Sequence, residues 1–274
     1  MLRGITGLLY VAILVGSLLL GPYFFYSILL LLAVLSLNEF ANIVKKSEII
    51  LPSKWIMIIT GVLLFLSVVL HATGYWQLTP FHVLPALIVI ILVMELFKNK
   101  KHPIINTAVT VFGVVYIALP LSLLNYLSVY PANSVHEYTP GLVLGFFILL
   151  WTYDTFAFLT GMSMGKNLMF ERLSPKKTWE GALGGFLFTL LSAYLISLFS
   201  GLFSLLQWLI IGAIIALFAT FGDLIESMFK RSLHLKDSGK VLPGHGGLLD
   251  RLDSVFVAAP AVYIYIEIIK IFMS

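Results

Sequence analysis

Nine long apolar stretches, separated by short polar segments, constrain this chain more than any other feature of its sequence. They cover residues 5–20, 23–44, 55–71, 81–97, 104–127, 142–162, 183–206, 208–228 and 254–272. A helix needs about 20 apolar residues to cross a bilayer. Hydrophobic residues make up 60% of the 274 residues, whereas only 11% are charged. The sequence therefore predicts an all-α, polytopic integral membrane protein with nine transmembrane helices.

The same pattern excludes several other classes of protein. A water-soluble globule of this size would not cover so much apolar surface. A porin-like barrel would alternate polar and apolar residues, whereas this chain has continuous apolar runs such as residues 28–35. The sequence has no cysteine, which excludes disulfides, thiolate metal sites and cysteine catalysis. We expect the first stretch to be retained rather than cleaved, because no small-residue cleavage site follows it.

Lysine and arginine residues lie in every second connection between the stretches, and only Lys270 departs from this rule. Because positively charged loops stay in the cytoplasm, the N-terminus is predicted to be cytoplasmic and the C-terminus outside. The two longest cytoplasmic segments, residues 163–182 and 229–253, hold most of the residue types that catalysis uses. We therefore expect residues 1–137 to form N-terminal transmembrane helices and residues 138–274 to form a catalytic transmembrane region.

Two pairs of carboxylates flank the second of these segments. Asp223 lies seven residues before Lys230, which places it roughly 10 Å inside the membrane boundary, where an ionisable group predicts function. Asp223 and Glu226 are three residues apart and share one helix face, and Asp250 and Asp253 repeat this spacing. Carboxylate ligands without His or Cys suit Mg²⁺. These four side chains are therefore candidate metal ligands, with Asp223 and Asp250 as candidate catalytic residues.

Simpler roles for these carboxylates stay open. Asp223 would be neutralised by an ion pair with Lys230 or Arg231, and Asp250 and Asp253 would be favoured at a helix N-terminus as caps. Capping does not explain a carboxylate as deep as Asp223, so the metal site is the favoured interpretation.

Three further acidic residues lie within or beside the apolar stretches. Asp154 is in the middle of the sixth stretch, so we expect it to face the bundle interior, either in a functional pocket or bonded to a Thr or Tyr. Glu39 and Glu95 lie near the membrane boundary, so we expect both to extend toward water.

The segment between the two carboxylate pairs is rich in glycine and basic residues. Glycines let backbone N–H groups approach an anion, and Lys and Arg supply charge and donors. With Mg²⁺, this composition suits polyphosphate binding and phosphoryl or nucleotidyl transfer, although basic loops are also attracted to lipid head groups. The candidate residues are Lys230, Arg231, Lys236, Ser238, Gly239, His245, Gly246, Gly247 and Arg251. Lys236 and His245 are candidate catalytic residues, and His245 suits phosphate contact, structural support or proton transfer.

The other cytoplasmic segment has its own cluster of candidate binding residues. Ser174 precedes Pro175, so we expect Ser174 to cap the next helix with the proline in its first turn. A helix N-terminus attracts phosphate, and Arg172, Lys176 and Lys177 would strengthen that field. The alternative is a charge cluster that only stops translocation of the chain.

Residues 227–253 resemble the signature of the phosphatidate cytidylyltransferase family, also called CDP-diacylglycerol synthases. They read Ser-Met-Phe-Lys-Arg-Ser-Leu-His-Leu-Lys-Asp-Ser-Gly-Lys-Val-Leu-Pro-Gly-His-Gly-Gly-Leu-Leu-Asp-Arg-Leu-Asp. Residues 174–181 and 154–157 are similar to other segments of that family, so the resemblance covers the C-terminal half. It implies Mg²⁺-dependent transfer of a cytidylyl group from CTP to phosphatidate, giving CDP-diacylglycerol and pyrophosphate for phospholipid biosynthesis.

The resemblance also implies a location and a set of partners. Asp223, Asp250 and Asp253 would hold Mg²⁺, with room for a second cation such as K⁺. The enzyme would lie in the cytoplasmic membrane, with its active site facing the cytoplasm, and would bind CTP, phosphatidate and the lipid bilayer but no nucleic acid. A homodimer stays open. Two other classes stay open as well: another CTP-using lipid enzyme, such as a polyprenol kinase or an archaeal ether-lipid cytidylyltransferase, and an ion or phosphate transporter.

Overall fold

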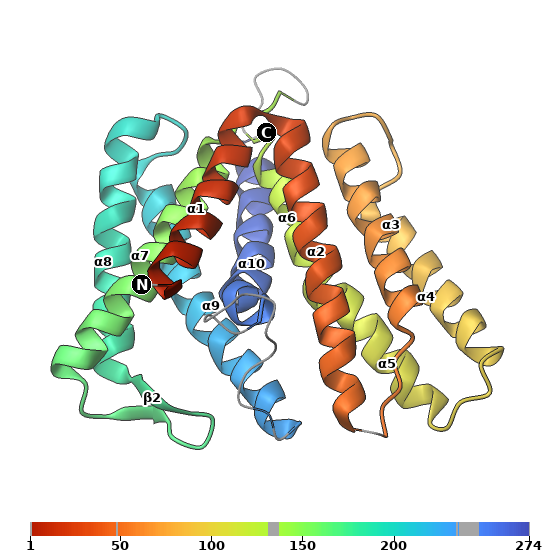
Figure 1. Cartoon of the computed structure of the whole chain (residues 1–274). Coiled ribbons are helices and arrows are strands. Elements are labelled where there is room, and N and C mark those ends of the chain that lie inside the picture. Colours follow the sequence, from red (N-terminus) through yellow and green to blue (C-terminus); the bar gives the residue numbers. More distant parts are fainter. Residues whose placement is uncertain (1, 48, 131–136, 234, 236–246, 274) are drawn as a thin grey trace. The chain divides into compact units, whose positions relative to one another are not determined.

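The computed structural model describes residues 2–47, 49–130, 137–233, 235 and 247–273, which are almost entirely helical (Figure 1). Within these residues, seven helical segments are long and apolar enough to cross a membrane. Two shorter apolar segments, Gly7–Leu20 and Pro80–Leu96, accompany them. The all-α membrane class is therefore confirmed, whereas nine crossings and the sides on which the termini lie stay predictions.

Every expected apolar stretch overlaps a helical segment. The helices are α1 (Leu2–Leu20), α2 (Pro22–Val44), α3 (Lys54–Ala72), α4 (Pro80–Leu96), α5 (Pro103–Gly113), α6 (Leu119–Leu127), α7 (Gly141–Met164), α8 (Trp179–Ser200), α9 (Leu205–Ser232) and α10 (Leu249–Met273). A 3₁₀ turn, η1 (Lys45–Ser47), follows α2, and a π-helical turn, η2 (Val114–Ala118), joins α5 to α6. The largest shift is at α8, which begins before the expected residue 183 and ends at Gly201 in the left-handed conformation.

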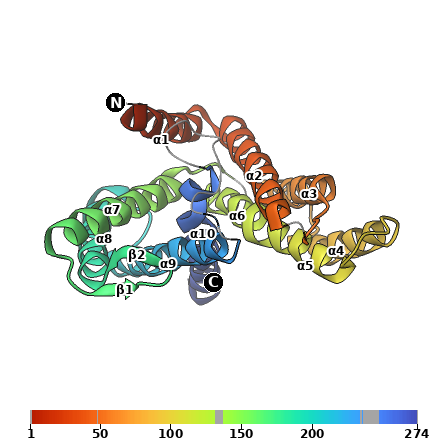
Figure 2. The same ribbon diagram turned by 60° about the horizontal axis from the view of Figure 1, so that its bottom comes forward.

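The chain divides into two compact units. The first contains Met1–Tyr138 and Leu233–Arg251, and the second contains Thr139–Ser232 and Leu252–Ser274. In the first unit, α2, α3 and α6 pack against one another (Figure 2), and Leu37 and Leu64 are fully buried there. The functional division expected at residue 137 stays a prediction.

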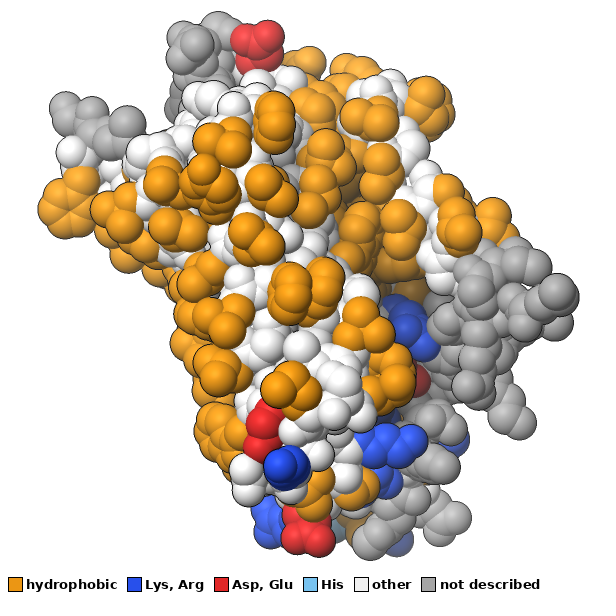
Figure 3. Space-filling view, turned by 90° about the vertical axis from the view of Figure 1, so that its left-hand side faces the viewer, with side chains coloured by type: hydrophobic (Ala, Val, Ile, Leu, Met, Phe, Trp, Pro, Cys, Tyr) orange, Lys and Arg blue, Asp and Glu red, His pale blue; other side chains and the backbone are white. Residues whose placement is uncertain are grey.

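In the second unit, small residues let α7, α8 and α9 pack closely, as is common between membrane helices. A Cβ on Gly145 would lie 2.6 Å from the ring of Trp208, which is fully buried. A Cβ on Gly185 of α8 would likewise lie 2.9 Å from the Cβ of Ala157 on α7. Figure 3 shows hydrophobic side chains over most of the outer face of α8, with most of the visible charged side chains in the lower half of the view. Such an apolar face suits contact with lipid.

A short hairpin between α7 and α8 corrects one expectation from the sequence. Strands β1 (Leu168–Phe170) and β2 (Ser174–Thr178) pair antiparallel, so Ser174 begins a strand and does not cap a helix. The N-cap of α8 is Thr178, whose Oγ1 accepts a hydrogen bond from the Gly181 N–H at 3.1 Å. Proline is tolerated on edge strands, which is why Pro175 is compatible with β2.

Candidate active site

A close crossing of α9 and α10 brings two of the predicted carboxylates together. A Cβ on Gly222 would lie 2.5 Å from the Asp253 carbonyl oxygen and 2.8 Å from Ser254 Cα, so only glycine fits there without movement. The next residue on α9 is Asp223, whose carboxyl group is within hydrogen-bonding reach of the Asp253 carboxyl group. Two carboxyl groups this close must share a proton or be neutralised by a cation.

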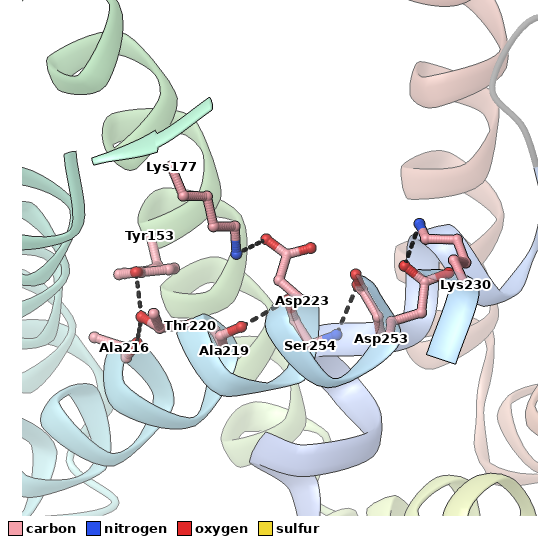
Figure 4. Close-up of polar contacts among 10 residues, drawn as sticks. Tyr153, Lys177, Ala216, Ala219, Thr220, Asp223, Lys230, Asp253 and Ser254 are labelled. Carbon is pink, nitrogen blue, oxygen red and sulfur yellow. Dashed lines mark hydrogen bonds and ion pairs between the residues drawn. The ribbon is translucent and has the colours of Figure 1, made fainter. Parts of the chain in front are cut away.

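Lys177 supplies one cation to this pair. Its ammonium group forms an ion pair with the Asp223 carboxylate (Figure 4). Because side chains alternate along a strand, Lys177 on β2 turns toward α9 while the neighbouring Lys176 is exposed. The ion pair of Asp223 therefore comes from the hairpin, whereas the alternative considered from the sequence was a pair with Lys230 or Arg231.

Lys230 instead pairs with the acidic residue one turn before it on α9. Its Nζ lies 2.6 Å from Oε2 of Glu226, and both side chains are largely buried. This pair joins residues one helical turn apart, at positions i and i+4. Glu226 also lies near the crossing of α9 and α10, since its charge acts on Asp253.

The hairpin is fixed to the start of α8, which determines where Lys177 lies. The carboxylate of Glu180, in the first turn of α8, accepts hydrogen bonds from the backbone N–H groups of Lys166 and Asn167 at 3.1 and 3.2 Å. The Asn167 side-chain amide donates a further bond at 2.6 Å. The Trp179 N–H donates to the Asn167 carbonyl at 2.9 Å. These bonds close the base of the hairpin, so β2 has a defined position beside α9.

Negative charge exceeds positive charge around Asp253. Its side chain is only 5% exposed, and its Oδ1 accepts a hydrogen bond from the Ser254 N–H at 2.7 Å. The charges of Asp223, Glu226 and Asp154 all act on it. Asp154 is exposed while its charge acts on both Asp253 and Tyr153, so its place in a functional pocket stays a prediction. Of these four carboxyl groups, those of Asp223 and Glu226 are each paired with a lysine.

This excess charge fits a divalent cation, but not a closed metal cage. Among the residues that the structure describes, no group of three or more His, Cys, Asp or Glu side chains is arranged to hold a metal. Mg²⁺ commonly binds through one or two carboxylates together with waters and substrate phosphates. The adjacent carboxyl groups of Asp223 and Asp253 therefore fit Mg²⁺ that is bound jointly with a phosphate ligand.

A tyrosine that sequence reasoning did not select lies behind Asp223. The hydroxyl groups of Tyr153 on α7 and Thr220 on α9 are hydrogen-bonded (Figure 4). Thr220 also donates to the Ala216 carbonyl at 2.8 Å. Tyr153 is buried, so this contact ties α7 to α9 one turn before Asp223. The sequence did carry a signal for this contact, because Tyr153 is next to Asp154 and Thr220 is three residues before Asp223.

In the first unit, carboxylates bind the backbone at the start of α10. Oδ2 of Asp250 accepts a hydrogen bond from the Gly247 N–H at 2.8 Å, which agrees with the alternative capping role. Oε2 of Glu39 on α2 accepts one from the Leu248 N–H at 2.7 Å. Glu39 is 4% exposed and Glu95, which accepts a bond from the Ser53 hydroxyl at 2.7 Å, is 5% exposed. The expectation that both extend toward water was wrong, because both are buried and bind buried donors.

The other predicted binding residues separate by exposure. The exposed ones are Arg172, Lys176, Arg231 and Arg251; Ser174 and Lys230 are half-buried, and Gly247 is buried. Five predicted residues lie outside the described part of the chain, namely Lys236, Ser238, Gly239, His245 and Gly246.

Comparison with known proteins gives one consistent family. A model described as the cytidylyltransferase family matches residues 1–269. A phosphatidate cytidylyltransferase of Rickettsia bellii (strain RML369-C) is 33% identical over 216 residues, which cover 76% of this chain and 89% of the relative. A phosphatidate cytidylyltransferase of Staphylococcus aureus (strain COL) is 31% identical over 265 residues, which cover 96% of this chain and 97% of the relative. The chain therefore belongs to the cytidylyltransferase family, as the resemblance of its C-terminal half indicated.

Proposed function

We propose that this protein transfers a cytidylyl group from CTP to phosphatidate, forming CDP-diacylglycerol and releasing pyrophosphate in an Mg²⁺-dependent reaction. The observation that carries the proposal is the junction of β2, α9 and α10, where Lys177 and the carboxyl groups of Asp223 and Asp253 meet. This junction supplies a cationic donor next to a pair of carboxyl groups that suit a metal ion. Relatives that match most of the chain are named for this reaction.

In this reaction, a phosphate oxygen of phosphatidate bonds to the α-phosphorus of CTP, while the bond from that phosphorus to the bridging oxygen of pyrophosphate breaks. The attacking phosphate is already an anion, so the protein has little need to remove a proton. The main barrier is repulsion between two anions, which fixed positive charges relieve. Mg²⁺, when bound, would polarise the transferred phosphoryl group and stabilise the leaving pyrophosphate.

Each predicted residue then has a proposed role. Asp223 and Asp253 would hold the cation, Glu226 would lie beside them as a further candidate ligand, and Asp250, one turn before Asp253 on α10, belongs to the set by its spacing. A second cation such as K⁺ is compatible with this set. The residues proposed to contact CTP or phosphatidate are Arg172, Ser174, Lys176, Lys177, Lys230, Arg231, Lys236, Ser238, Gly239, His245, Gly246, Gly247 and Arg251. Lys236 and His245 are the proposed catalytic residues of the loop.

Lys177 has two partners in this scheme. Its pair with Asp223 is partly exposed, with 26% and 39% of the two side chains accessible. Because both side chains remain partly accessible, a cation at Asp223 and a phosphate at Lys177 could each replace this pair. With a cation held by Asp223, the Lys177 ammonium group would be available to donate to a substrate phosphate oxygen.

We place the active site on the cytoplasmic side of the cytoplasmic membrane. The alternation of basic connections supports this orientation, with the N-terminus inside and the C-terminus outside. The phosphate of phosphatidate would then lie at the interface with its acyl chains in the bilayer, while CTP arrives from the cytoplasm. A homodimer is compatible with the proposal and is not required by it.

The proposal is tested with purified protein, phosphatidate and CTP labelled at either the α- or the γ-phosphate, with and without Mg²⁺. Label from the α-phosphate should enter the lipid only when Mg²⁺ is present. Label from the γ-phosphate in the lipid would identify a kinase and refute the proposal. Flux of ions or phosphate into proteoliposomes without CTP turnover would identify a transporter, with the same consequence.

Variants test the carboxylates directly. Asp223→Asn and Asp250→Asn each replace a carboxylate by a neutral group of the same shape, so we expect each to lower turnover at least 100-fold in folded protein. Glu267→Gln is a matched control, because Glu267 pairs only locally with Lys270 at 2.6 Å near the opposite end of α10. Robust turnover by either Asn variant would remove the metal assignment.

A further inference from the structure

A buried carboxylate on α2 contacts the backbone at the start of α10, although the two residues are 209 positions apart in the sequence. Glu39 is 4% exposed, and the Leu248 residue whose N–H it binds is 3% exposed. A buried carboxylate inside an apolar helix is costly unless it is bound to donors or cations. A neutral side chain at this position of α2 would avoid the free-energy cost of burying a carboxylate, so Glu39 needs donors that stabilise its charge.

The geometry of the contact indicates what this buried carboxylate does. Leu248 immediately precedes α10, and the first N–H groups of a helix lack partners within the helix. The bond from the Leu248 N–H to Oε2 of Glu39 is 2.7 Å long, a length typical of charge-assisted hydrogen bonds. The negative charge also lies at the positive end of the α10 dipole. Glu39 is thus an N-terminal anchor for α10 that is supplied by another helix.

The same turn carries Asp250. Its Oδ2 accepts a hydrogen bond from the Gly247 N–H at 2.8 Å, so consecutive N–H groups bind two different carboxylates. The Arg251 N–H donates to the Leu248 carbonyl at 3.1 Å. A shift of the Leu248 peptide group would therefore shift both ends of the turn that holds the Asp250 side chain.

We propose that Glu39 is a positioning residue for the reaction: it fixes the first turn of α10 and thereby the direction of the Asp250 carboxylate. This inference rests on the proposed function for the role of Asp250. Glu39 does not touch the substrates, and it acts through the Leu248 N–H. Within the first unit, α2 thus contributes a residue that orients Asp250.

Three substitutions separate the acceptor position from the charge. Glu39→Leu removes the acceptor, and Glu39→Asp shortens the side chain by one methylene group, so its carboxylate no longer reaches the Leu248 N–H. Both variants should lower kcat by about 10- to 100-fold, which is the range for residues that orient metal ligands. Glu39→Gln keeps a carbonyl oxygen at the same reach and should recover most of that loss. Glu95→Leu is the matched control, because Glu95 is equally buried but binds the Ser53 hydroxyl at 2.7 Å, before the start of α3.

Amide hydrogen exchange of the ligand-free protein provides a readout that does not depend on turnover. The Leu248 amide should exchange about tenfold faster in Glu39→Leu than in wild type or Glu95→Leu, because its acceptor is lost. If Glu39→Leu does not fold, the Gln and Asp variants still decide the question. Wild-type kcat in Glu39→Asp, or unchanged Leu248 exchange in a folded Glu39→Leu variant, would overturn the proposal. Failure of wild type to use CTP and phosphatidate would instead refute the proposed function, while the exchange result would still test the anchor.

Discussion

Gly222 offers a direct test of whether the spacing between α9 and α10 controls activity. In Gly222→Ala, the new Cβ would lie 2.5 Å from the Asp253 carbonyl oxygen and 2.8 Å from Ser254 Cα, whereas ordinary contacts begin at 3.4 Å. Both nearby atoms belong to the backbone, which cannot turn away as a side chain does. The two helices must therefore separate by about 1 Å at this point, and a misplacement of about 1 Å lowers an enzymatic rate by about 100-fold.

The same substitution should leave the protein folded. Overpacking a close contact destabilises a protein by about 1–3 kcal/mol, while replacing Gly by Ala inside a helix stabilises it by about 1 kcal/mol. The net loss of about 0–2 kcal/mol is small beside the stability of a typical domain. We therefore expect Gly222→Ala to give folded protein with a turnover of α-labelled CTP about 100-fold below that of wild type.

Gly16→Ala is a matched control, because Gly16 is also helical and a Cβ there would meet nothing within 4 Å. It should retain wild-type turnover and unfold at an equal or slightly higher temperature. Turnover by Gly222→Ala within threefold of wild type would contradict the reasoning. It would mean that the distance between the Asp223 and Asp253 carboxyl groups does not limit the reaction.

Two further predictions concern the hairpin and α8. Lys177→Ala should lower turnover by more than Lys176→Ala, because Lys177, unlike its neighbour Lys176, forms the ion pair with Asp223. The turnover rates of both variants at several salt concentrations check this order. A larger loss for Lys176→Ala would contradict it. Thr178→Ala should lower the free energy of unfolding by about 1 kcal/mol through loss of the α8 N-cap. Thermal unfolding checks it against Ser163→Ala, whose exposed hydroxyl only binds carbonyls of its own helix; equal melting temperatures would contradict the capping role.

The helices could be predicted from the sequence because membrane spans depend on the length and apolarity of one segment at a time. The breaks between them follow local rules as well. Pro22 begins α2 and Gly201 ends α8 in the left-handed conformation, as proline and glycine commonly do. The carboxylates were also recognisable, since Asp223 is charged where its neighbours are apolar.

The partners of these carboxylates were not predictable in the same way. The sequence offered Lys230 or Arg231 as an alternative partner of Asp223, but the strand β2 brings Lys177 there. The strand itself was missed because Ser174 and Pro175 have the local pattern of a helix start, and only pairing with β1 reveals otherwise. The contact of Glu39 with Leu248 depends on chain segments far apart in the sequence.

In the proposed function, the position of Lys177 on a hairpin rather than on a transmembrane helix would let this lysine change partners. A lysine on β2 reaches Asp223 through a partly exposed side chain. Lys230, by contrast, is held on α9 beside Glu226 with both side chains largely buried. The two lysines therefore differ in their surroundings: Lys230 is paired with Glu226 in a largely buried position, whereas the more accessible Lys177 would, in the proposed function, exchange Asp223 for a phosphate oxygen.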